Sequence, residues 1–214
     1  MYVPKHFEVS EWAEITGFVA RARAADLVTV DSAGLPVATL MPAFWDTSAM
    51  GESNYGSLVM HMARANPQWK SIEPGSLGLA IVHGPQAYIS PSNYEGKLTD
   101  HKVVPTWNYQ AVHVYGSPRI VSDHDEVYKI LSHLTARNES NPSYRVETLP
   151  QDFVEKEMKG IVAFQIEVTK IEANYKLSQN RDDEDYYNIV SRLEERGDEM
   201  SHGVAEAMKE KRPS

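Results

Sequence analysis

Short links between strand-like segments constrain the fold of this chain more than any other feature. Leu27–Asp31 and Val37–Met41 are rich in β-branched and apolar residues, and the turn-forming run Ser32–Pro36 separates them. Two strands joined so closely form an antiparallel hairpin. Pro42 has no N–H group for a strand ladder, so the second strand is expected to be bulged or to lie at an edge as it continues toward Trp45.

Most of the remaining chain repeats this pattern. Leu77–His83 and Gln86–Ser90 flank Gly84-Pro85, which predicts two strands joined by a tight turn. Further strands are predicted at Gly56–Ala63, Val104–Val121 and Ile161–Ile171. A parallel, doubly wound sheet requires a helix after every strand, and most of these links are too short for one. The sequence therefore predicts an antiparallel, closed β-barrel.

Helices are predicted between and after the strands. Ser10 can cap a first helix with its apolar face on Trp12–Ala22, and Asp123 with Glu126 forms a capping box for a second. Asp183–Glu195 and a short polar segment predict two more helices at the end of the chain. The fold class is therefore α+β, mainly β with flanking helices.

The composition excludes several classes of protein. The chain has 214 residues, enough for one large domain, and no cysteine, which excludes disulfides, zinc–thiolate sites and iron–sulfur clusters. No apolar run approaches the roughly 18 residues of a membrane helix, and the first residues resemble no leader, so we expect a cytoplasmic protein without membrane contact. The net charge of −9 opposes nonspecific binding to DNA, which depends on Lys and Arg.

Known catalytic motifs are absent from the sequence. It contains no P-loop, no Gly-x-Gly-x-x-Gly, no His-Glu-x-x-His and no Gly-x-Ser-x-Gly. The eight histidines show no metal-ligand spacing, so neither a metal site nor a set of catalytic residues is predicted.

The segment His61–Lys70 has the pattern of a strand that leads into a helix. Asn66 can cap that helix with Pro67 at its first position, and Arg64 stands just before it. Free N–H groups at a helix start and a guanidinium side chain suit an anion such as phosphate. An ordinary capped helix with a surface arginine would give the same pattern.

Polar side chains gather at four predicted strand ends. These residues are Thr39 and Pro42; His61, Arg64 and Asn66; Ser90 and Ser92; and Thr106, Trp107 and Asn108. Arg, Ser and Thr suit a phosphate, whereas amides and an aromatic edge suit a polar heteroaromatic ring. The set fits a phosphorylated planar cofactor, although core packing would explain Trp69 and Trp107 equally well.

Five blocks of the sequence resemble the PaiB family of negative transcriptional regulators. The blocks are Tyr2–Phe7, His61–Lys70, Ala87–Tyr94, Val104–Tyr109 and Lys176–Asn180. This family is similar to flavin-binding split-barrel proteins. The resemblance implies a six-stranded antiparallel split barrel over residues 1–180. It also implies a helical extension over residues 181–214 that packs on the barrel or on a partner subunit. The expected assembly is a homodimer that binds FMN at its interface.

The resemblance also implies which residues bind FMN. One wall of the site corresponds to Thr39, Leu40, Met41 and Pro42, and the segment that holds ring and phosphate corresponds to His61, Ala63, Arg64 and Asn66. The segment that closes the site from the partner subunit corresponds to Lys176, Ser178, Gln179 and Asn180. The set is completed by Ser90, Thr106, Trp107 and Asn108. Asn66-Pro-Gln-Trp69 replaces the Ser-Arg-Lys run of pyridoxamine-phosphate oxidases. That oxidation is therefore not expected.

Three functions remain open. The first is a regulatory or sensory flavoprotein that influences transcription. Direct contact with DNA is not supported, because the chain is acidic and shows no basic recognition helix. The second is a flavin-dependent oxidoreductase or flavin reductase on the same barrel. The third is a haem-binding protein in which His61 or a neighbouring histidine is the axial ligand.

Overall fold

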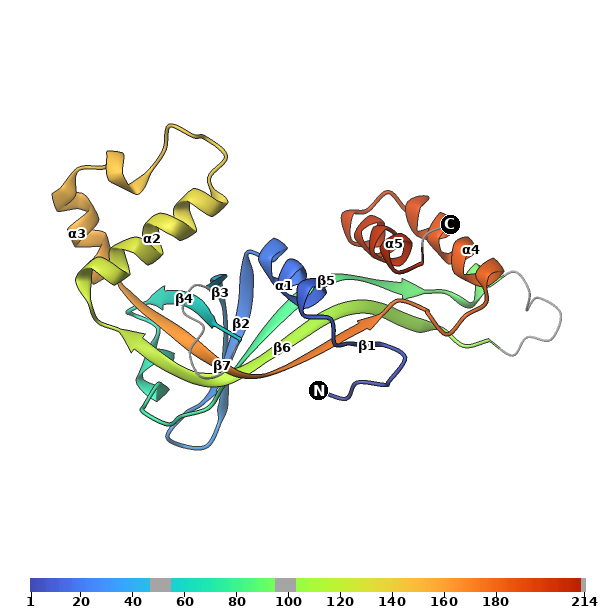
Figure 1. The fold of residues 1–214 in the computed structure, drawn as a ribbon, viewed down its shortest axis with the longest axis horizontal. Helices are drawn as coiled ribbons and strands as arrows, with labels where there is room; N and C mark the ends of the chain where they lie inside the picture. Colours follow the sequence, from blue (N-terminus) through green and yellow to red (C-terminus); the bar gives the residue numbers. More distant parts are fainter. Residues whose placement is uncertain (47–54, 95–102, 213–214) are drawn as a thin grey trace. The chain divides into compact units, whose positions relative to one another are not determined.

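The computed structural model describes residues 1–46, 55–94 and 103–212, and the elements within them are shown in Figure 1. In chain order they are β1 (Glu8–Val9), α1 (Trp12–Arg21), β2 (Ala24–Val30), β3 (Pro36–Asp46), β4 (Ser57–Ala63), η1 (Pro67–Ser71), β5 (Gly78–Ile89), η2 (Pro91–Asn93), β6 (Thr106–Val121), α2 (His124–Asn138), η3 (Val146–Thr148), α3 (Gln151–Lys159), β7 (Ile161–Lys176), α4 (Asp183–Glu194) and α5 (Glu199–Lys211). None of these helices is both long and apolar enough to cross a membrane.

The strands within the described ranges form one sheet in the order β1-β7-β4-β3-β2-β5-β6, and β7 also pairs with β6. The last pairing makes a closed ring of six strands, with β1 added outside it. The pairings with a defined register are all antiparallel. The predicted α+β class and six-stranded antiparallel barrel are therefore confirmed.

The chain forms two compact units. Unit 1 contains residues 1–15, 83–112 and 172–214, and unit 2 contains residues 16–82 and 113–171. The long strands β5, β6 and β7 each contribute residues to both units. The predicted division of the chain at residue 180 stays a prediction.

The hairpin of β2 and β3 in unit 2 has the predicted form. Its register runs from Ala24 opposite Pro42 to Val30 opposite Pro36. The carboxylate of Asp31 accepts hydrogen bonds from the N–H groups of Ala33 and Leu35 at 2.8 and 2.9 Å. Gly34 has a φ of 80°, a conformation that side chains disfavour. The local turn chemistry therefore favours the register of this hairpin.

A glycine permits the close approach of β6 and β7 in unit 2. A Cβ atom on Gly116 would lie 1.9 Å from the main-chain oxygen of Glu167 and 2.8 Å from Cγ2 of Ile166. Backbone cannot yield as a flexible side chain can, so only glycine fits here. The tight contact keeps β6 against β7 where the ring of strands closes.

Helices α2 and α3 lie side by side and cover part of unit 2 (Figure 1). The side chain of Asp123 caps α2 by accepting from the N–H of Glu126 at 2.9 Å, as the capping box predicted. Ile130 and Leu134 of α2 pack with Phe44 and Val59 of the sheet. Val154 and Met158 of α3 form a second apolar cluster with Val146.

Helices α4 and α5 pack against each other in unit 1 (Figure 1). Asp182 caps α4, which spans Asp183–Glu194 and agrees closely with the predicted helix. The buried Tyr186 of α4 donates its hydroxyl to the main-chain oxygen of Met208 in α5 at 2.6 Å. Burial raises the pKa of Tyr186 to about 12, which keeps this donor protonated.

Some predicted details were wrong or incomplete. Gly84-Pro85 does not form a turn, because β5 continues from Gly78 to Ile89. A Cβ on Gly203 of α5 would lie 2.8 Å from Cβ of Pro85, so α5 packs closely on this part of the strand. Helix α3 was not predicted, and the last strand is longer than predicted, ending at Lys176.

The short helix η1 is fixed to the sheet by the side chain of Gln68, which is only 4% exposed. Its Nε2 donates to the main-chain oxygens of Leu27 and Val37, both at 3.0 Å, and to Oγ1 of Thr29 at 3.2 Å. Its Oε1 accepts from Oγ1 of Thr39 at 2.5 Å. One amide therefore connects η1 with both β2 and β3.

Replacing Gln68 with Met should destabilise the protein. The change keeps the size of the side chain but leaves buried oxygen atoms of β2 and β3 without their donor, which costs about 1–3 kcal/mol for each unsatisfied group. Urea denaturation followed by circular dichroism measures the loss. The matched control is Gln165→Met in β7, because no hydrogen bond of the Gln165 side chain exists among the described residues. Equal midpoints for the two variants would show that the Gln68 amide is not needed.

Candidate functional site

The sixteen residues predicted to bind the cofactor divide between the two units. Thr39, Leu40, Met41, Pro42, His61, Ala63, Arg64 and Asn66 lie in unit 2, on β3, on β4 and in the segment before η1. Ser90, Thr106, Trp107, Asn108, Lys176, Ser178, Gln179 and Asn180 lie in unit 1, at or beyond the ends of β5, β6 and β7. Each group is described separately below.

The unit 2 residues lie where β3 and β4 cease to pair. The register between these strands runs from Asp46 opposite Ser57 to Ala43 opposite Met60. The next residues no longer pair with each other: Pro42 of β3 pairs only with β2, and His61 of β4 pairs only with β7. Pro42 cannot donate to a ladder, which contributes to the end of the pairing. The predicted residues therefore start where the two strands part.

Leu40 gives this region an apolar surface. Its side chain is 65% exposed, although its neighbour Met41 is buried. Alternation along β3 points these two side chains to opposite faces of the strand. An exposed leucine on a strand is a surface on which a flat ring can pack, and the small side chain of Ala63, also exposed, leaves room on β4.

Thr39 and Asn66 bind each other and Gln68. Nδ2 of Asn66 donates to Oγ1 of Thr39 at 3.0 Å, and Oδ1 of Asn66 caps η1 by accepting from the N–H of Gln68 at 3.0 Å. The hydroxyl of Thr39 donates to Oε1 of Gln68, and the amide of Asn66 donates to Thr39, so both side chains are engaged within the protein. Thr39 and Asn66 therefore shape the segment around the site. Gln68 was missed in the sequence, where its place after the capping Asn66 and Pro67 was the only available signal.

His61 has a ring nitrogen without a partner. Its Nδ1 is buried and forms no hydrogen bond within the described residues. Burial lowers the pKa of His61, so the imidazole is neutral near pH 7. A buried polar atom normally has a partner, which a water molecule or a ligand can supply. This unsatisfied nitrogen is consistent with the polar edge of a bound ring nearby.

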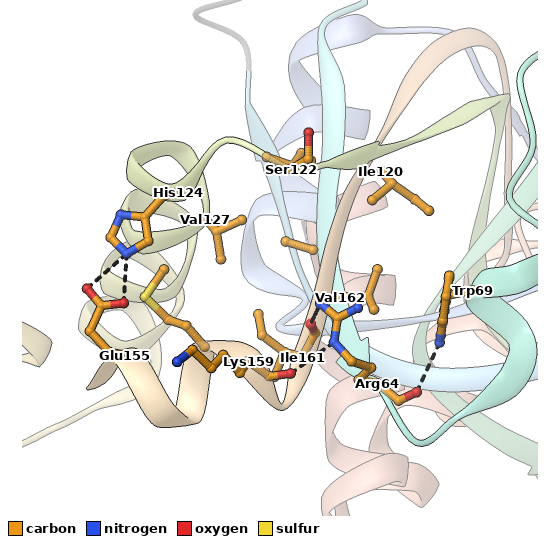
Figure 2. A pocket seen from close by; sticks show the side chains of 13 residues that line it. Arg64, Trp69, Ile120, Ser122, His124, Val127, Glu155, Lys159, Ile161 and Val162 are labelled. Carbon is orange, nitrogen blue, oxygen red and sulfur yellow. Dashed lines mark hydrogen bonds and ion pairs between the residues drawn. The ribbon is translucent and has the colours of Figure 1, made fainter. Parts of the chain in front are cut away.

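Arg64 is held at the start of β7, as Figure 2 shows. Its Nε donates to the main-chain oxygen of Lys159 at 2.9 Å, and its Nη2 donates to that of Ile161 at 2.8 Å. The indole of Trp69 lies 6.0 Å from the guanidinium carbon and donates to the main-chain oxygen of Arg64 at 3.0 Å. Nη1 has no partner among the described residues and remains available to an anion.

In unit 1, Lys176 lies at the end of β7 beside the start of β6. Its ammonium group donates to Oγ1 of Thr106 and, at 3.0 Å, to the main-chain oxygen of Trp107. Burial, and to a smaller extent the charge of Arg181, lowers the pKa of Lys176. Trp107 is 47% exposed, and its indole donates to Oε1 of Gln86 at 3.0 Å. This tryptophan is therefore a surface residue and does not pack in the core.

Asn108 and Ser178 form a buried pair. Nδ2 of Asn108 donates to Oγ of Ser178 at 2.9 Å, Oγ lies 3.1 Å from Oδ1 of Asn108, and the sulfur of Met208 lies 3.7 Å from Nδ2. Ser178 has a φ of 62°, which is uncommon for a residue other than glycine. Surrounding contacts must hold such a conformation. These two residues therefore fix the chain after β7, and their polar atoms are not directed at a ligand.

Gln179 also bonds to its own segment. Its Oε1 accepts from the N–H of Leu177 at 2.8 Å, and its Nε2 donates to the main-chain oxygen of Tyr175 at 2.5 Å. Arg212, just after α5, donates to the main-chain oxygen of Gln179 at 2.9 Å. Ser90 caps η2 through its bond from the N–H of Ser92 at 3.3 Å. Asn180 is exposed and makes no side-chain bond among the described residues.

The unit 2 residues fit a phosphorylated flavin. A neutral imidazole with an unsatisfied nitrogen, the free edge of a fixed guanidinium and an exposed apolar side chain lie within a few residues of the end of the β3–β4 pairing. An imidazole can bond to the polar edge of a ring, and a guanidinium edge can bond to a phosphate. FMN supplies redox chemistry when it is bound, and these side chains can hold and orient it.

Comparisons with known proteins agree with this chemistry. The family model described as "Putative FMN-binding domain" matches residues 1–170. The chain is 36% identical over 213 residues to "Protease synthase and sporulation protein PAI 2" of Bacillus subtilis. The similar region covers 99% of this chain and 98% of that protein. An uncharacterized protein of Emericella nidulans is 28% identical over 189 residues, with 75% of each chain covered.

Solved structures of distant proteins have the same fold. The flavocytochrome of Azotobacter vinelandii matches with a TM-score of 0.60 and 14% identity, covering 87% of this chain and 78% of that one. A conserved hypothetical protein of Mycobacterium tuberculosis matches with a TM-score of 0.57 and 15% identity, covering 82% and 91%. Identities this low show the fold alone. The family model and the relative from Bacillus subtilis span most of the chain, so the protein belongs to the FMN-binding domain family and is an FMN-binding protein of the PaiB type.

Proposed function

We propose that this FMN-binding protein is a homodimeric negative regulator of transcription. In this proposal FMN lies between Thr39–Pro42 and His61–Asn66 of one subunit and Lys176–Asn180 of its partner. The observation that carries the site is the pair of unused nitrogens, Nδ1 of His61 and Nη1 of Arg64, on the segment that follows the end of the β3–β4 pairing. The protein itself acts in the cytoplasm.

Each unit 2 residue has a distinct role in the proposed site. Nη1 of Arg64 binds the phosphate of FMN, while its other donors hold the guanidinium in place on Lys159 and Ile161. His61 bonds to the polar edge of the ring, and Leu40 packs on the ring face. Because Asn66 and Thr39 are already bonded to each other, they keep the segment in shape before FMN arrives.

The partner subunit supplies the second side of the proposed site. Lys176 brings a positive charge on a segment that Asn108 and Arg212 hold in place. Leu40 and Trp107 are large apolar side chains that are exposed in one chain, and a dimer interface would cover such surface. Ser90, Thr106, Gln179 and Asn180 complete the partner's contribution to the proposed site.

The regulatory role rests on similarity to the protein from Bacillus subtilis, which is named for protease synthase and sporulation. The two chains are similar from end to end, so the likeness is not confined to a shared cofactor domain. The net charge of −9 opposes a mechanism based on direct DNA contact. FMN occupancy of the dimer is the proposed signal. Nothing in the described residues favours the oxidoreductase or the haem alternative.

Replacing Arg64 with Ala should weaken FMN binding about 10- to 100-fold, the usual effect of losing a hydrogen bond to a charged group. Binding of riboflavin, which has no phosphate, should change much less. Quenching of flavin fluorescence during titration measures both affinities.

The control for this change is Arg119→Ala. Arg119 is an exposed arginine of the same unit, and its nearest carboxylate oxygen, on Glu126, is 3.9 Å away. This variant should bind FMN normally. Equal weakening of FMN and riboflavin by Arg64→Ala would mean that Arg64 does not hold the phosphate.

Mixed dimers should show whether two subunits share each site. Arg64→Ala and Lys176→Ala each impair binding alone. If a site uses Arg64 of one chain and Lys176 of the other, a mixed dimer has one intact site and one with both defects. Random reassociation of equal amounts should then restore roughly a quarter of the sites. Stoichiometric FMN titration of the refolded mixture gives this fraction.

The outcome differs sharply for a site made by one chain. Every chain in the mixture then carries a defect, and no intact site can form. Ultracentrifugation of the same samples gives the oligomeric state. A monomer that binds FMN with full affinity would refute the shared site.

Loss of FMN binding should relieve repression. Four strains are compared: wild type, a deletion of the gene for this protein, and strains whose only copy of the gene carries Arg64→Ala or Arg119→Ala. The Arg64→Ala strain should show the same increase in target transcripts over wild type as the deletion strain. The Arg119→Ala strain should repress these transcripts as wild type does. Transcript sequencing of the four strains measures this effect. Gel retardation with upstream DNA at two salt concentrations should show no salt-dependent complex, because the protein is acidic.

Unchanged transcripts in the deletion strain would contradict the regulatory role and leave FMN binding intact. A complex that weakens steeply with salt would contradict only the indirect route and would show direct DNA contact.

A further inference from the structure

A cavity of about 350 Å³ lies in unit 2 between β6, α2, α3 and the start of β7 (Figure 2). Its lining comes from both helices, from these two strands, and from Arg64 and Trp69 of the segment after β4. One lining residue, Arg64, also belongs to the proposed FMN site, whereas the side chains of the other lining residues have no role in it. Its volume is at the lower end of the range for sites of small organic ligands.

The floor of the cavity is apolar. Val121, Val162, Ala163 and Met158 line it and are all buried in the surrounding structure. Val127 of α2 adds another aliphatic side chain. A ligand that fills this space must therefore have a hydrophobic body, because a polar one would lose its hydration without finding partners.

The rim of the cavity is positively charged. Lys159 is exposed and its ammonium group has no partner in the part of the chain that the structure describes. Glu155 is the only carboxylate in the lining, and Nε2 of His124 lies 2.9 and 3.0 Å from its two oxygens. Hydrogen bonds to Asp125 and Glu155 raise the pKa of His124, which favours the charged imidazolium beside Glu155. Arg64 contributes a further positive charge to one wall.

We propose that this cavity binds a small amphipathic carboxylate, with its apolar body on the aliphatic floor and its anionic group beside Lys159. Lys159 and Arg64 outnumber Glu155 in the lining, so the rim attracts an anion although the whole chain has a net charge of −9. Glu155 disfavours a second negative charge on the ligand.

Trp69 makes an aromatic body the better fit. Its indole lines the cavity on the side of Arg64, and the labelled side chains in Figure 2 place it opposite the His124–Glu155 pair. An aromatic ring can pack against indole in offset or edge-to-face geometry. The expected ligand class is therefore an arylalkanoate or a similar aromatic monocarboxylate.

The test uses the complete protein and 4-fluorophenylacetate as the probe, observed by fluorine NMR. Saturable binding is expected at pH 7.5. The amide analogue, which has the same body without the charge, should bind about two- to fivefold more weakly, because the interaction of a partly exposed ion pair is lost. Lys159→Gln should weaken binding of the acid by about the same factor and leave that of the amide unchanged.

Lys156→Gln is the matched control, because Lys156 is an exposed lysine of the same helix that does not line the cavity. It should bind the probe normally. Equal binding of acid and amide, or an unchanged affinity in Lys159→Gln, would overturn the proposal. Displacement of the probe by FMN would show that the cavity belongs to the flavin site. FMN affinity is measured on the same variants and should be normal in both, so a failure here leaves the proposed function untouched.

Discussion

The structure around the proposed flavin site depends on a single buried amide. Gln68 has two N–H donors, which three acceptors on β2 and β3 share, and its oxygen accepts from Thr39 of β3. A buried amide without these partners would be costly, so η1 can dock in only one position. That position fixes Asn66, whose side chain in turn reaches Thr39. The wall of the site is therefore set by protein contacts before any cofactor binds.

Local chemistry made much of the fold predictable. The hairpin of β2 and β3 was recognisable because Asp31 and Gly34 satisfy the turn from within five residues. Helix α2 was recognisable because its cap comes from Asp123, one residue before it begins. The strand β4 and the cap of η1 by Asn66 were recognisable in the same way, from a capping asparagine after a strand. In each case the deciding interaction joins residues that are close in sequence.

The errors arose where a distant contact overrides local preference. Gly-Pro normally indicates a turn, but Gly84-Pro85 stays in β5 and lies against Gly203, more than a hundred residues later in the chain. Gln68 looked like a polar helix residue, and only the positions of Leu27 and Val37 reveal its role. The bond between Ser178 and the buried Asn108, 70 residues earlier in the chain, likewise has no signal in the local sequence.

The two units use their polar groups in opposite ways, which bears on how a shared site would work. In unit 1, the side chains of Lys176, Ser178 and Gln179 are bonded within their own unit. In unit 2, His61 and Arg64 keep unused nitrogens. A segment that is already ordered loses little entropy when it meets a ligand, whereas unused donors supply the binding enthalpy. We therefore expect unit 2 to contribute more of the affinity for FMN than the partner's unit 1, which adds the charge of Lys176 and shields the cofactor.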